Sequence, residues 1–243
     1  MTKLIAILFV GVAAAGCSTS FNRLAMEQEL QGEQRIVFDD VDVLKIEQLR
    51  PQIQFPIRLA VVPPARVSPR YWQEGSAKGE HEELMALGEQ LKKEGIVSSF
   101  TVIPQILLQG SDQSLKAIRL AAARMGADAV LILRSVTDVD SRMNPLSVLN
   151  VTIVGMWLIP GHHTDALTMV EGMVIDNRNQ FLYFAGSAEG LGSTYGPALV
   201  IQDRDAIGES RRNALHSFGE VLIKEARQAK TYVPGPRYET PGK

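Results

Sequence analysis

The stretch Ala127-Asp-Ala-Val-Leu-Ile-Leu133 is apolar at every position except Asp128. A strand of this composition is expected to be buried on both faces, which requires a sheet with other elements packed on each side. The preceding residues 111–125 place apolar side chains on one helical face and end before Gly126, a residue that terminates helices readily. The pair therefore predicts a helix packed on a buried sheet.

The same alternation extends toward the N-terminus. Residues 57–62 and 99–103 are short runs rich in β-branched residues and predict strands, and residues 80–94 between them carry leucines at helical spacing. Later in the chain, three consecutive strands are predicted at 146–159, 166–176 and 181–188. The last two should form an antiparallel hairpin because the turn-forming cluster 176–179 joins them. A glycine-rich loop at 190–197 and a helix over 205–229 complete the pattern.

These elements predict an α/β fold of mixed α+β character. It consists of a single mixed β-sheet with helices packed on it, in the order strand-helix-strand-helix-strand, three antiparallel strands and a C-terminal helix. The apolar run 148–158 fits a central buried strand better than a membrane-inserting hairpin strand, although its length would allow either.

The first seventeen residues predict export. Lys3 precedes an apolar run at 4–12 and small residues at 13–16, which is the order of a signal peptide. The run is shorter than the roughly 20 residues that a membrane-spanning helix needs. Ala14-Ala15-Gly16-Cys17 resembles the bacterial lipobox, in which the cysteine receives a diacylglycerol and cleavage falls between Gly16 and Cys17. Cys17 is also the only cysteine of the chain, so it has no disulfide partner within it.

We therefore expect a signal peptide at 1–16, a lipidated tether at 17–56, a globular domain at 57–230 and a disordered tail at 231–243. By resemblance to lipoprotein sorting rules, Ser18 favours the outer membrane, with the protein facing the periplasm. The expected partners are the membrane, through the lipid on Cys17, and a protein or a second copy of the chain. A net charge of −2 does not suggest nucleic acid as a partner.

A few ionisable side chains are weak ligand candidates. His162, His163 and Asp165 are predicted in one loop, and Asp138 and Asp140 follow the buried strand. Solvated side chains are the favoured interpretation over metal binding or acid–base chemistry, because adjacent histidines on extended chain diverge and zinc needs three or four ligands. No catalytic residue, metal or cofactor is expected.

Other candidate motifs lack the context that their chemistry needs. The stretch Gly186–Gly192 does not open a helix directly, as a phosphate-binding loop would. Ser187 and Ser193 lie outside a Gly-x-Ser-x-Gly turn.

Four stretches resemble the bacterial rhombotarget lipoprotein family, with a similarity that covers residues 57–228. They are Gly126–Leu133, Val151–Gly161, Ala166–Asp176 and Gly186–Thr194. The resemblance implies an exported lipoprotein found alongside a rhomboid-type sorting protease, without an assigned reaction. Residues 236–243 do not match the C-terminal sorting tail associated with that family. More loosely, the strand and helix order is similar to periplasmic lipoproteins related to the curli secretion channel and to penicillin-binding-protein activators.

Two hypotheses follow. The preferred one is a non-enzymatic envelope lipoprotein that serves as an assembly or accessory factor and presents an apolar surface patch. The alternative is an envelope hydrolase or small-ligand-binding protein that uses loops 135–145, 160–165 and 190–197. It predicts that these loops meet in one pocket of charged side chains.

Overall fold

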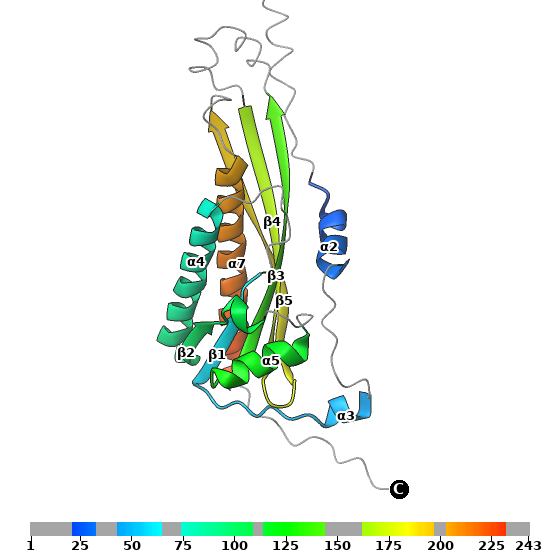
Figure 1. Ribbon diagram of the computed structural model, residues 1–243, viewed down its shortest axis with the longest axis vertical. Coiled ribbons are helices and arrows are strands. Elements are labelled where there is room, and N and C mark those ends of the chain that lie inside the picture. Colours follow the sequence, from blue (N-terminus) through cyan, green and yellow to red (C-terminus); the bar gives the residue numbers. More distant parts are fainter. Residues whose placement is uncertain are drawn as a thin grey trace, which may run out of the picture.

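The computed structural model describes residues 21–32, 43–64, 74–108, 114–143, 162–196 and 203–231. Its centre is a five-stranded sheet in the order β2-β1-β3-β4-β5 (Figure 1). The strands are β1 (Ile57–Val62), β2 (Val97–Val102), β3 (Ala129–Met143), β4 (His162–Asp176) and β5 (Leu182–Gly196). β1 is parallel to β2 and β3, whereas β4 is antiparallel to both of its neighbours, β3 and β5. The predicted mixed α/β sheet and its 176–179 hairpin turn are confirmed.

Helices cover both faces of the sheet. α4 (Glu74–Lys93) and the long α7 (Asp203–Thr231) lie on one face, and α5 (Leu115–Arg124) lies on the other (Figure 1). The connections explain this division, because β1-α4-β2 and β2-α5-β3 step across the sheet in opposite directions and right-handed crossovers then place their helices on opposite faces. α2 (Arg23–Gly32), α3 (Val43–Gln48) and the short 3-10 helix η2 (Gln105–Leu107) complete the described elements.

β3, β4 and β5 have fifteen residues each and extend well beyond β1 and β2. β1 pairs with β3 only over Ala129–Ile132. We call the region around β1 and β2 the body end of the sheet. The distal half consists of residues 135–143, 162–170 and 188–196, which pair in register across β3, β4 and β5.

The expectation of a glycine-rich loop at 190–197 is wrong, because residues 190–196 belong to β5. The glycines have a packing role: a Cβ on Gly190 would overlap the backbone nitrogen of Ala214, and one on Gly192 would overlap the carbonyl oxygen of Ala206. They allow α7 to lie directly against β5.

A chain of hydrogen bonds joins the distal half to α7. The Thr168 hydroxyl lies 2.9 Å from that of Thr137 and 2.7 Å from that of Ser210, which donates to the Ile207 carbonyl. Arg211 donates to the Thr137 hydroxyl and pairs with Glu80 of α4 at 2.9 Å. Each buried hydroxyl therefore has a partner, as burial requires.

Several sequence-based boundaries differ from the structure. β3 continues ten residues past the predicted end at Leu133. The helix predicted over 111–125 begins at Leu115, because Ser114 is its N-cap and accepts from the Ala117 amide at 3.3 Å. The predicted strand 146–159, Cys17 and the predicted tail beyond Thr231 lie outside the described residues. Among the described helices, none combines the length and apolar character needed to cross a bilayer.

Candidate functional site

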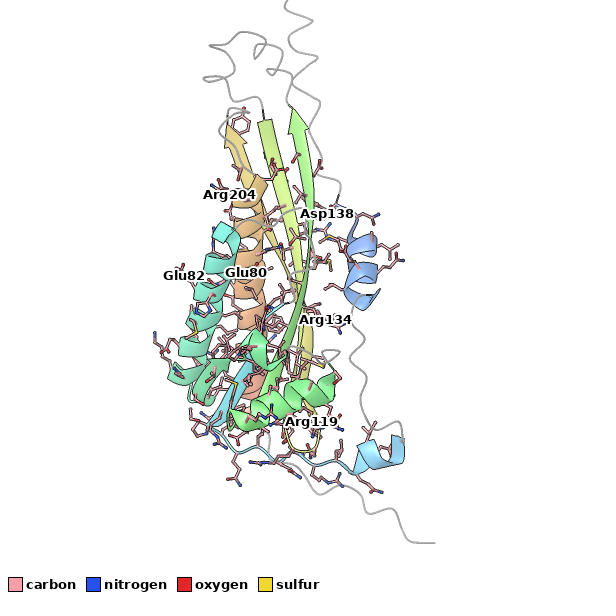
Figure 2. All side chains as sticks on the ribbon, in the orientation of Figure 1. Glu80, Glu82, Arg119, Arg134, Asp138 and Arg204 are labelled. Carbon is pink, nitrogen blue, oxygen red and sulfur yellow. The ribbon has the colours of Figure 1, made fainter. Side chains whose placement is uncertain are left out.

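The distal half gathers most of the residues singled out in the sequence. Asp140 pairs in register with Asp165, and Asp165 pairs with Ser193 on β5. Strand alternation places Asp138 and His163 on the same face, opposite α7; Figure 2 labels Asp138 on the distal half of β3. The backbone of His162 is part of β4, but its side chain is not described. Residues 135–143, 162–165 and 190–196 are thus strands rather than the loops that the ligand-binding alternative requires.

Asp165 is the centre of this group and is only 8% exposed. Its Oδ1 accepts a hydrogen bond of 2.6 Å from the Ser193 hydroxyl and lies 3.1 Å from Nε2 of His163. A nucleophilic serine needs the imidazole between itself and the carboxylate, so that the imidazole can take its proton. Here the carboxylate stands in the middle and the serine donates to it directly. This arrangement orders the side chains but does not activate Ser193.

The other candidates are also tied to local partners. Asp138 accepts from the Val139 amide at 2.9 Å, and the ring of His163 packs edge-on against Tyr195 with centroids 5.9 Å apart. Within the described ranges, no group of three or more His, Cys, Asp or Glu side chains is arranged to hold a metal ion. The structure therefore brings Asp138, Asp140, His163 and Asp165 onto one face without building a metal centre from them.

α2 lies on the same face of the distal half, beside β3 (Figure 1). Its Met26 is 3% exposed and packs on Val136, Leu167 and Met169. Arg23 pairs with Glu189 of β5 at 3.1 Å, and the carbonyl of Leu30 accepts from Arg134. Residues 21–30 of the predicted tether therefore pack on the sheet.

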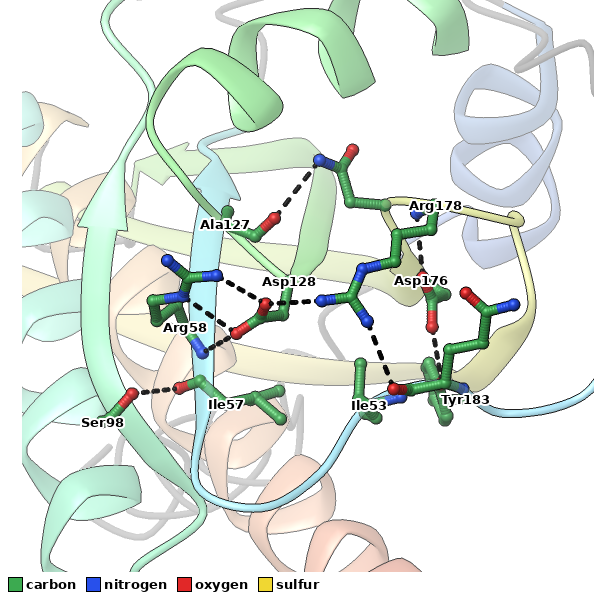
Figure 3. Close-up of polar contacts among 11 residues, drawn as sticks. Ile53, Ile57, Arg58, Ser98, Ala127, Asp128, Asp176, Arg178 and Tyr183 are labelled. Atoms are coloured by element: carbon green, nitrogen blue, oxygen red, sulfur yellow. Dashed lines mark hydrogen bonds and ion pairs between the residues drawn. The ribbon is translucent and has the colours of Figure 1, made fainter.

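A second polar cluster lies at the body end (Figure 3). The Asp128 carboxylate accepts from the backbone amide, Nε and Nη2 of Arg58 at 3.0, 3.1 and 2.8 Å, and from Arg178 at 3.2 Å. The hydrogen bonds from the Arg58 side chain are the main reason that the pKa of Asp128 is lowered. This carboxylate joins the start of β1, the start of β3 and the β4–β5 turn.

The fully buried Asp176 holds the same turn to the tether. It accepts from the Arg178 amide and from the Tyr183 hydroxyl, both at 2.8 Å. The Tyr183 oxygen in turn accepts from the amides of Gln52 and Ile53 at 2.9 and 3.2 Å. Burial, helped by the bond to Asp176, raises the pKa of Tyr183 to about 12. The cluster is therefore a clamp that fixes residues 52–53 to the sheet.

Next to this clamp, on the α7 face, lies a cavity of about 630 Å³. Its walls come from the tether, β1, the end of α4, the start of β5 and the end of α7, and most of them are apolar. The apolar lining includes Ile53, Phe55, Leu59, Leu91, Phe184, Leu222 and Ala226. Sequence reasoning missed this site because its walls are separated by up to about 180 positions and share no local motif.

Comparison with known proteins leaves the family open. No protein-family model matches the chain. No curated protein matches it at a significant level either. The membership of the rhombotarget lipoprotein family suggested by the sequence therefore stays a prediction.

Several solved structures are similar to parts of the chain. The lipoprotein GNA1162 from Neisseria meningitidis is 15% identical with a TM-score of 0.36, and the match covers 71% of this chain and 99% of that one. A minor lipoprotein from Acinetobacter baumannii is 10% identical with a TM-score of 0.32, covering 74% and 96%. A PelC dodecamer from Paraburkholderia phytofirmans is 16% identical with a TM-score of 0.33, covering 69% and 91%. Two of these three proteins are bacterial lipoproteins, which is the class predicted from residues 1–17. TM-scores below 0.5 do not assign this chain to that class.

Proposed function

We propose that this chain is a lipid-anchored protein of the bacterial cell envelope whose body is a non-enzymatic accessory module that binds a protein partner or a second copy of itself. The observation that carries the proposal is the lipobox-like Ala14–Cys17, placed directly after a short apolar run. Four residues after Cys17, Phe21 and α2 pack on the sheet. A lipid on Cys17 would therefore hold the body close to the membrane.

The position of α2 also gives the orientation of the body. The chain from Cys17 to Phe21 spans at most about 14 Å when fully extended. Phe21 packs on the cluster that contains Leu167, and from Leu167 the strand continues five residues to His162, or roughly 17 Å. The reach of the anchor and the remaining length of the distal half are therefore similar. We infer that the distal half meets the bilayer surface and that the body end points away from it.

The surface for a partner is proposed on β5. This strand is an edge of the described sheet, and its Leu191 and Tyr195 are 56% and 57% exposed on the face opposite α7. Edge strands that expose large apolar side chains are common points of association. The Ser193–Asp165–His163 arrangement supports a binding role over hydrolysis, because the serine hydroxyl donates to the carboxylate and not to the imidazole.

Lipidation is tested by labelling cells with a palmitate analogue and separating their membranes. We expect wild type and the control Thr19→Ala to carry the label and to sediment with the outer membrane, and Cys17→Ala to lose both properties. Ser18→Asp should move the protein to the inner membrane if the sorting rule applies. Continued labelling or unchanged membrane association of Cys17→Ala would contradict the anchor.

Association is tested by native mass spectrometry of the detergent-extracted protein. We expect wild type to exceed the mass of one chain, and Leu191→Glu to return it to that mass. Ile106→Glu is the matched control, because Ile106 is as large as Leu191 and is 73% exposed on η2. This variant should behave as wild type. A wild-type protein whose native mass equals that of one chain, with no partner bound, would contradict the proposed surface.

A further inference from the structure

The cavity at the body end has apolar walls and a polar mouth. Leu59, Leu91 and Leu222, which belong to the main core cluster, line its interior and are at most 4% exposed to solvent. The Tyr183 hydroxyl also reaches this region, but it is occupied by Asp176 and by the amides of residues 52–53. The walls therefore offer a ligand hydrocarbon contacts and few polar ones.

Charged side chains are confined to α7 at the mouth. Lys230 lines the cavity, and its ammonium donates to the carbonyl oxygens of Glu94 and Gly95 at 3.2 and 3.3 Å. These two acceptors are uncharged, and an ammonium has three donors. The nearby Glu94 carboxylate is bonded to Arg227. Glu225 is the other charged residue of the lining and carries the opposite sign.

From this distribution we propose that the cavity binds one acyl chain of an amphiphile, with the anionic head of that amphiphile against Lys230. The volume of about 630 Å³ falls in the range of small-molecule sites, roughly 300 to 1,000 Å³. Apolar walls with a cationic group at the entrance match the two parts of such a molecule. Its head is a carboxylate, as in a fatty acid, or a phosphate, as in a lysophospholipid. This goes beyond the proposed function, because the cavity lies in the body and does not depend on Cys17.

The tether forms one wall of this site. Ile53 and Phe55 are partly buried against the main core cluster, and the Tyr183 clamp fixes the chain at residues 52–53. An acyl chain in the cavity would therefore contact the same segment that connects the body to its anchor.

The test is photo-crosslinking of the full-length protein in membranes with a diazirine derivative of palmitate, followed by peptide mapping. We expect crosslinks within residues 51–57 and 222–230. Ala226→Trp, which fills the cavity, should reduce them roughly tenfold. Ala123→Trp, at an exposed alanine on α5, is the size-matched control and should leave them unchanged. The absence of crosslinks in these segments, or equal labelling of Ala226→Trp, would overturn the proposal.

Two variants at exposed positions of α7 test the head group. Lys230→Gln should weaken labelling by a few-fold and Glu225→Gln should strengthen it, because the two charges act on an anion with opposite signs. Excess palmitate that displaces the label supports a carboxylate head, and excess palmitoyl lysophosphatidylglycerol that does so supports a phosphate head. Displacement by neutral monopalmitoylglycerol at equal efficiency, or by none of the three, would overturn the anionic assignment.

Discussion

The two ends of β3, β4 and β5 use carboxylates differently. At the body end, Asp128 and Asp176 connect segments that are far apart in the chain: β1, β3, the β4–β5 turn and the tether. In the distal half, Asp165 contacts Ser193 on the next strand and His163 two residues away on its own strand. The body-end carboxylates therefore join segments that are distant in the chain, whereas the distal carboxylate joins neighbouring strands. The connection of the distal half to α7 and α4 runs through hydroxyl groups and Arg211 instead. Three variants and one pH titration test this difference, from the largest expected effect to the smallest.

Gly190→Val should be the most damaging change, because the new Cβ would overlap the α7 backbone rather than a movable side chain. We expect a loss of about 3 kcal/mol in the free energy of unfolding, measured by urea denaturation. Gly208→Ala is the control, since its Cβ would find its nearest neighbour at 3.6 Å, and alanine in a helix is more stable than glycine by about 0.5 to 1 kcal/mol. Equal stability of Gly190→Val and wild type would contradict the close packing of α7 on β5.

Asp176→Asn compares the two ends directly. It weakens the bonds to Tyr183 and to the Arg178 amide in a fully buried site, and we expect a cost of about 2 kcal/mol. Asp165→Asn changes a carboxylate of similar burial that links only neighbouring strands, and we expect it to cost less than half as much. A larger loss of stability for Asp165→Asn than for Asp176→Asn would contradict the proposed difference between the two ends.

Met26→Ala tests the attachment of α2. The side chain is 3% exposed, so its truncation should cost about 2 kcal/mol and should release α2 from the sheet without unfolding the body. Limited proteolysis within residues 21–32 should then accelerate. Leu24 is 65% exposed on the same helix, so Leu24→Ala should be cleaved as slowly as wild type. Cleavage of both variants at one rate would show that α2 is not held by Met26.

The pH dependence of stability should report on Asp128. Its pKa is lowered in the folded state, chiefly by the Arg58 side chain. The stability that it contributes is therefore complete above its unfolded pKa of about 3.9, and is lost as the pH falls through the lower folded pKa. Urea titrations at a series of pH values below 5 should show a smaller acid-dependent loss for Asp128→Asn and for Arg58→Gln than for wild type. If both variants lose as much stability in acid as wild type does, the Asp128–Arg58 pair is not the source of that loss.

Much of the fold could be predicted from the sequence because local periodicity carries the information. The strand at 57–62, the helix before Gly126 and the 176–179 hairpin follow from patterns a few residues long. The length of β5 could not be read in this way. Gly190 and Gly192 have no side chains that could show the alternation of a strand. They are needed because α7, which follows later in the chain, packs directly against them.

The candidate sites show the same limit. The sequence identified the ionisable candidates by residue type alone: Asp138, Asp140, His163 and Asp165. The pairing of Asp140 with Asp165 depends on the register between β3 and β4. That register also decides that Asp165 lies between Ser193 and His163, which argues against a serine nucleophile. The body-end cavity combines residues 51–57 with the end of α7, a pairing that only the folded chain reveals.

The most direct test of the account is the distance of each end of the protein from the bilayer. Because Cys17 is the only natural cysteine, Tyr195→Cys and Leu182→Cys can each be labelled specifically with a donor fluorophore. Both positions are exposed on β5, about 43 Å apart along the strand. With the lipidated protein in vesicles that contain a head-group acceptor, we predict strong energy transfer from position 195 and weak transfer from position 182. Equal transfer from both positions, or the reverse order, would contradict a body that is anchored through Cys17 with its distal half at the membrane.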